Sequence, residues 1–103
     1  MKISELIAEN IELTPEQAQL ADELIPVRDY EKGSILLEEG KVARESYFNI
    51  RGCVRSYHII DGEERTTAFF VEGDAISSHT SYLNQTPASH YLACVEDCTL
   101  AVL

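Results

Sequence analysis

The feature that most constrains the fold is a run of short segments rich in β-branched and aromatic residues, separated by Gly33, Gly40, Gly52, Gly62 and Gly73. Strands at such spacing, with turn residues between them, are typical of antiparallel jelly rolls and barrels. We expect strands near 27–30, 34–38, 46–51, 53–60, 64–71, 90–95 and 98–103. The predicted fold class is therefore mainly β, an antiparallel double-stranded β-helix (jelly roll) with two short N-terminal helices.

Local signals support both parts of this prediction. Asp61-Gly62 favours the positive φ angles of a two-residue hairpin turn. Thr14-Pro15-Glu16-Gln17 is typical of a capping box with proline at the first helical position. Pro26 should end that helix, because the residue before a proline favours an extended conformation. The apolar residues expected on the two helices are Ile3, Leu6, Ile7 and Ile11 on the first, and Ala18, Leu20, Ala21, Leu24 and Ile25 on the second.

Size and composition indicate one cytoplasmic domain. The chain has 103 residues, 45% of them hydrophobic, which suffices for an ordinary core. Its apolar runs are too short to cross a bilayer, so we expect no membrane contact. Glu5 and Glu9 lie among the apolar residues at the start of the chain, whereas a signal peptide needs an uninterrupted apolar centre. Three cysteines, an odd number, favour free thiols.

Charge limits the partners of this chain. Eighteen acidic residues against eight basic ones give a formal net charge of −10. Phosphate backbones attract proteins with the opposite imbalance. We therefore do not expect this chain alone to bind DNA.

One segment, GDAISSHTSYLNQTPAS (73–89), does not fit the regular alternation of strands and tight turns. It is rich in serine and threonine and separates two stretches that are predicted to be strands. Connections longer than about 12–15 residues are uncommon in compact domains and usually bind something or are disordered. The 73–89 segment is therefore the first candidate for a functional site.

Three blocks of the sequence resemble a known family: YEKGSILLEEG (30–40), YFNIRGCVRSYHIIDGEERTTAFFVEGD (47–74) and ACVEDCTLAVL (93–103). They are similar to the effector domain of the Crp/Fnr family of bacterial transcription regulators, which is a cyclic-nucleotide-binding-like β-roll. The resemblance implies a helical segment at 1–26 and the roll at 27–103, within one domain. It also implies a dimerising helix and a helix-turn-helix domain that these residues do not include. DNA binding is then expected only through a C-terminal part outside this chain, in a full-length homodimer.

In that family, the segment that begins at the equivalent of Gly73-Asp74 is the phosphate-binding cassette. There, backbone amides near a short helix and polar side chains hold a cyclic nucleotide. The resemblance implies a ligand site in the 73–89 segment, with Thr80 and Ser81 as further hydroxyls. The residues predicted to bind a ligand are Gly73, Ser77, Ser78, Ser89 and Arg55.

Arg55 has two interpretations. It reaches a ligand cavity if its strand face points inward. Alternatively, it is exposed and pairs with Glu63 or Glu64, which is the interpretation that we favour.

Both charged anchors of the family's nucleotide site are absent. The ribose-binding glutamate aligns with Ser78 and the phosphate-binding arginine with Ala88, whereas the adjacent serine is kept as Ser89. Hydrogen bonds to charged groups contribute about 1.5–3 kcal/mol each, so losing a bidentate arginine weakens phosphate binding by about a hundredfold or more. Glu72 and Asp74 are expected to add repulsion. We therefore predict an unknown effector other than cAMP, or none, and no cofactor.

Two alternatives come from other classes of protein. A cupin-like enzyme would hold a metal ion on His58, His79 and His90, although the sequence lacks the His-x-His motif of that class. Cys94 and Cys98 form one close pair without a second pair. A stand-alone interaction module would dimerise through an exposed apolar face. No common catalytic motif occurs, and we expect that the protein is not an enzyme.

Overall fold

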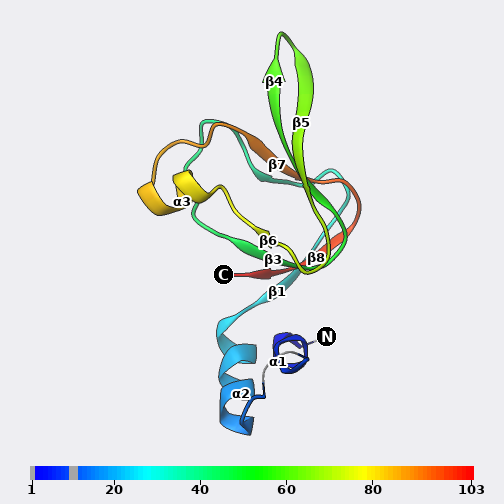
Figure 1. Ribbon diagram of the computed structural model, residues 1–103, viewed down its shortest axis with the longest axis vertical. Coiled ribbons are helices and arrows are strands. Elements are labelled where there is room, and N and C mark those ends of the chain that lie inside the picture. Colours follow the sequence, from blue (N-terminus) through cyan, green and yellow to red (C-terminus); the bar gives the residue numbers. More distant parts are fainter. Residues whose placement is uncertain (1, 10–11) are drawn as a thin grey trace.

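The computed structural model describes residues 2–9 and 12–103, without the side chains of Ile7, His79 and Thr80. Its helices are α1 (Ile3–Ala8), α2 (Pro15–Leu24) and α3 (His79–Asn84). One antiparallel sheet has the strand order β1 (Val27–Tyr30), β8 (Cys98–Val102), β3 (Tyr47–Arg51) and β6 (Ala75–Ile76). The other has the order β2 (Ile35–Leu37), β7 (Tyr91–Cys94), β4 (Val54–Ile60) and β5 (Glu63–Phe70). Figure 1 shows the roll above the first two helices.

This architecture confirms the predicted mainly β jelly roll. Each of the seven expected strands is present, with ends that differ from the prediction by at most one residue. The eighth strand, β6, was not expected because its two residues are too short to give a pattern. It lies in the 73–89 segment, which therefore contains regular structure.

The two sheets share one hydrophobic core. On β4, Val54 and Ser56 are buried whereas Arg55 between them is partly exposed, as the two-residue period of a strand requires. Leu92 and Cys94 on β7 pair with Ser56 and Val54 on the same inward face. The core cluster comprises Tyr47, Val54, Ile76, Leu92, Cys94, Cys98, Leu100 and Val102.

The hairpin of β4 and β5 extends away from the roll at the end opposite to the helices (Figure 1). Its turn residues Asp61 and Gly62 have φ angles of 54° and 79°, which confirms the predicted tight turn. Glu63 to Phe69 are all exposed, because β5 is an edge strand on a projecting hairpin. Buried and exposed residues therefore do not alternate along β5.

The turn at Gly52 requires glycine. Its φ angle is +104°, and a Cβ atom there would lie 2.6 Å from the carbonyl oxygen of Asp97 and 2.7 Å from Sγ of Cys98. The β3–β4 turn thus packs against the β7–β8 turn. All three cysteines are free thiols, with Cys94 and Cys98 buried and Cys53 half-buried.

The second helix has the predicted ends, but its apolar side is largely exposed. Thr14 and Gln17 form the predicted capping box, and α2 ends before Pro26 with Ile25 extended. No α2 residue is buried, and Leu20 and Leu24 are 54% and 69% exposed. The reason is that α2 lies away from the roll and packs mainly on α1 (Figure 1). Ile11, expected on the first helix, is outside the described residues. None of the described helices is long and apolar enough to span a bilayer.

Candidate functional site

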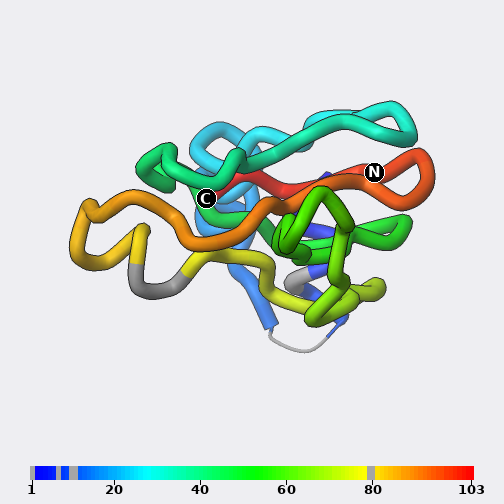
Figure 2. The backbone as a smooth tube through the Cα atoms, turned by 90° about the horizontal axis from the view of Figure 1, so that it is seen from above, coloured from blue at the N-terminus to red at the C-terminus, as the bar shows by residue number. Residues whose placement is uncertain are grey.

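The 73–89 segment leaves the roll through β6, forms the six residues of α3 and returns to β7 (Figure 2). Ser78 occupies the N-cap position of α3, but its hydroxyl makes no capping hydrogen bond. Gln85 ends the helix in the left-handed conformation, with a φ angle of 54°. The helix is less than two turns long, so its dipole supplies little of the anion affinity that we expected from its amides.

Ser81 fixes α3 to the segment that precedes β3. Its hydroxyl accepts a hydrogen bond from the backbone N–H of Ala43 at 2.8 Å and donates one to the carbonyl oxygen of Thr86 at 2.5 Å. Gln85 donates from Nε2 to the carbonyl oxygen of Ala43 at 3.3 Å. Ser81, predicted as a possible ligand hydroxyl, is therefore already used within the protein.

A second tie holds the returning part of the 73–89 segment. The backbone N–H of Ala88 donates to the carbonyl oxygen of Lys41, and that of Gly40 donates to the carbonyl oxygen of Ala88, both at 2.8 Å. Val42 and Pro87 form an antiparallel bridge between these bonds. These backbone hydrogen bonds pair the end of the 73–89 segment with residues 40–43, in the manner of two antiparallel strands.

A pocket of about 430 Å³ lies between α3 and the returning part of the segment. Its volume falls in the range of small-molecule sites, about 300–1,000 Å³. Hereafter it is called the α3 pocket. Its lining residues are Ser78, Ser81, Thr86, Pro87, Ala88, Ser89 and His90.

Two of the residues predicted to bind a ligand, Ser78 and Ser89, line the α3 pocket. Ala88, where the resemblance implies an arginine in other members, also lines it and is buried. Gly73 and Ser77 do not line it, and the N–H of Gly73 donates to the carbonyl oxygen of Asn49 at 2.8 Å. The predicted ligand role of these residues remains a prediction.

Two carboxylates that we expected to repel an anion face elsewhere. Asp74 accepts a hydrogen bond at Oδ2 from the N–H of Val71 at 2.8 Å, within its own turn. Glu72 is exposed, and neither residue lines the α3 pocket. The repulsion predicted from the sequence therefore has no local basis in this pocket.

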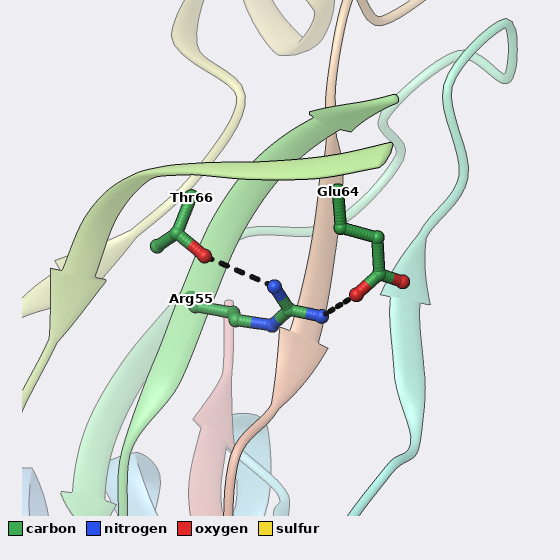
Figure 3. Close-up of polar contacts among 3 residues, drawn as sticks. All are labelled: Arg55, Glu64 and Thr66. Carbon is green, nitrogen blue, oxygen red and sulfur yellow. Dashed lines mark hydrogen bonds and ion pairs between the residues drawn. The ribbon is translucent and has the colours of Figure 1, made fainter. Parts of the chain in front are cut away.

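Arg55 lies on the strand face opposite to Val54 and Ser56, outside the α3 pocket. Its guanidinium group donates to Glu64 at 2.5 Å and to Thr66 at 3.0 Å (Figure 3). It also lies 4.0 Å from the centre of the Tyr57 ring. The favoured interpretation, an arginine paired with Glu64, is confirmed.

Sequence reasoning missed the place of two histidines beside the α3 pocket. His90 lines it, and His58 donates from Nδ1 to the carbonyl oxygen of Ser89 at 2.7 Å. Their rings are perpendicular, with centres 6.1 Å apart. Burial lowers the pKa of His90, the nearby His58 lowers it further, and Glu39 opposes the shift. The inward face of β4 was the available signal, because His58 follows Ser56 by two positions.

The metal interpretation required His58, His79 and His90 to converge. The side chain of His79 is outside the described part of the structure. Within the residues that are described, no group of three or more His, Cys, Asp or Glu side chains is arranged to hold a metal ion.

Comparison with known proteins identifies the family of the β-roll. Residues 27–103 match the model of the cyclic nucleotide-binding domain. No curated protein sequence matches the chain.

Solved structures share the fold. The catabolite activator protein of Thermus thermophilus has 29% identity and a TM-score of 0.71, over 88% of this chain and 43% of that one. The regulatory domain of Toxoplasma gondii protein kinase A with cAMP has 21% identity and a TM-score of 0.74, over 98% and 40%. A regulatory subunit of a cAMP-independent protein kinase A from Trypanosoma cruzi, bound to guanosine, has 20% identity and a TM-score of 0.76, over 98% and 37%. This chain thus spans less than half the length of each. It belongs to the cyclic nucleotide-binding domain family.

Proposed function

We propose that this chain is the effector-sensing domain of a Crp/Fnr-type bacterial transcription regulator and that its effector is not cAMP. The observation that carries the proposal is the α3 pocket, which has Ser78 and buried Ala88 at the positions of the two charged anchors. The similarity to the Thermus thermophilus catabolite activator protein, at 29% identity, favours a transcription regulator. In this proposal the roll acts as a sensor and not as a catalyst.

The contacts around the α3 pocket provide a route for the signal. Ser81 and Gln85 bond to Ala43, and Ala88 bonds to Gly40 and Lys41. A ligand between α3 and Ser89 would therefore move α3 and residues 40–43 together. The ligand shifts the equilibrium between two conformations of the domain only to the extent that it binds one conformation more tightly than the other.

A protein of this fold can bind a ligand that has no cyclic phosphate. The Trypanosoma cruzi regulatory subunit is described as cAMP-independent and bound to guanosine, a molecule that carries no phosphate. This precedent supports a different effector, because the chain here lacks the arginine that a cyclic phosphate prefers.

DNA binding is assigned to a part outside these residues, because the net charge of −10 opposes contact with phosphates. The test is to express the complete gene product and the 103-residue chain and to select DNA sequences with each. We expect salt-dependent DNA binding by the complete homodimer and none by the 103-residue chain. A complete product without DNA binding would refute the regulatory role.

A further inference from the structure

The α3 pocket holds unused hydrogen-bonding groups. Ser81 already bonds to Ala43 and Thr86, which leaves the hydroxyls of Ser78 and Ser89 and the imidazole of His90. Ser78 is only 4% exposed, and its hydroxyl makes no capping hydrogen bond to α3. A ligand with donor and acceptor groups would find partners in these side chains.

Among the described residues that line the pocket, His90 alone can carry a charge. Burial and the nearby His58 keep the pKa of His90 low, so its imidazole is neutral near pH 7. A phosphate would lose its hydration without gaining a cation, in a protein of net charge −10. These conditions favour a ligand without charge.

The imidazole of His90 adds a flat ring to the hydroxyls that line the pocket. The His58 ring lies perpendicular to it, with the two centres 6.1 Å apart, and an aromatic ligand ring would pack against His90. A planar ring with several donors and acceptors, joined to a hydroxylated sugar, complements the hydroxyls and the His90 ring that line the pocket.

We propose that the effector held in the α3 pocket is an uncharged nucleoside, bound through Ser78, Ser89 and His90. This inference rests on the sensing function proposed above and specifies its ligand. The sugar hydroxyls would bond to the serines, and the base would lie against the imidazole of His90. Phosphate groups on the nucleoside would weaken binding.

The test is calorimetric titration at pH 7.5 with guanosine and adenosine, each paired with its 3′,5′-cyclic phosphate. We expect at least one nucleoside to bind at least about tenfold more tightly than its cyclic phosphate, which corresponds to about 1.4 kcal/mol. Ser78→Ala and Ser89→Ala should each weaken that binding by about three- to tenfold, the effect of one hydrogen bond. Ser46→Ala, outside the pocket, should leave it unchanged, and thermal unfolding followed by circular dichroism confirms that each variant folds. A cyclic phosphate that binds as tightly as its nucleoside, or no binding by either nucleoside, would overturn the inference.

A second measurement separates this inference from the proposed function. DNA binding by the complete gene product is compared between the natural protein and Ser78→Glu, with the same nucleosides and with an equimolar set of organic acids. A response to an organic acid that disappears in Ser78→Glu would leave the sensing function standing and refute the nucleoside. DNA binding that responds to none of these compounds and is unchanged in Ser78→Glu would count against both.

Discussion

The imidazole of His58 donates from Nδ1 to the carbonyl oxygen of Ser89, 2.7 Å away, and so joins β4 to the end of the 73–89 segment. His90, the next residue, has its ring 6.1 Å from that of His58. Burial lowers the pKa of His90, and the nearby His58 lowers it further, so protonation of His90 is disfavoured beside the α3 pocket.

The free energy of unfolding should decrease on acidification because of His90. Burial and His58 lower the pKa of His90 below its ordinary value of 6.5, so folding favours the neutral ring. The stabilisation is complete above pH 6.5 and is lost as the pH falls through the lowered pKa, because the unfolded chain binds more protons there. Urea unfolding of the protein and of His90→Asn at pH 7.5 and 5.5 measures this effect. The variant should lose less stability on acidification, and an equal loss would contradict the assignment.

Ser81 should be structural. Ser81→Ala leaves the buried N–H of Ala43 without a partner, and we expect a loss of about 1–3 kcal/mol in the free energy of unfolding. Ser46→Ala is the matched control, since Ser46 is half-buried and its hydroxyl bonds to none of the described residues. Denaturant unfolding of both variants tests this, and equal losses would show that the bond to Ala43 adds nothing.

Gly52 should tolerate substitution worse than other glycines. Gly52→Ala places Cβ against Asp97 and Cys98, whereas Gly33→Ala meets no atom within 4 Å at a similar positive φ. The control should lose about 1–2 kcal/mol from backbone conformation alone. Gly52→Ala should lose about 1–3 kcal/mol more, because packed neighbours must move. Thermal and urea unfolding compare the two, and equal losses would contradict the close packing of the turns.

Arg55 should stabilise the hairpin without taking part in ligand binding. Arg55→Ala removes the ion pair with Glu64 and the contact with the Tyr57 ring, at a cost of about 1 kcal/mol. Arg65→Ala, whose ion pair with Glu63 is far more exposed, should cost less than about 0.5 kcal/mol. Unfolding measurements decide between them. If Arg55→Ala loses no more unfolding free energy than Arg65→Ala, the ion pair between Arg55 and Glu64 does not stabilise the hairpin.

Much of the fold was predictable from local chemistry. Asp61-Gly62 and the Thr14–Gln17 capping box are short-range signals, and the structure contains both. The failures need longer-range information. The apolar face of α2 gave no sign that the helix would lie apart from the roll, because periodicity identifies a face but not its neighbour.

The candidate site was predictable in part. Ser78 and Ser89 were identified through the resemblance, and both line the α3 pocket. The contact between His58 and Ser89 was missed because it joins residues 31 positions apart. Ser81 was taken for a free hydroxyl, since only the folded chain brings it to Ala43.

In the proposed function, the α3 pocket is a cyclic-nucleotide site that lacks its two charged anchors. The most direct test restores them in Ser78→Glu/Ala88→Arg and measures cAMP binding by calorimetry, with circular dichroism to confirm folding. We predict that the folded double variant binds cAMP at least about a hundredfold more tightly than the natural protein, because a bidentate arginine and a carboxylate are regained. A natural protein that binds cAMP as tightly as the folded double variant would contradict the claim.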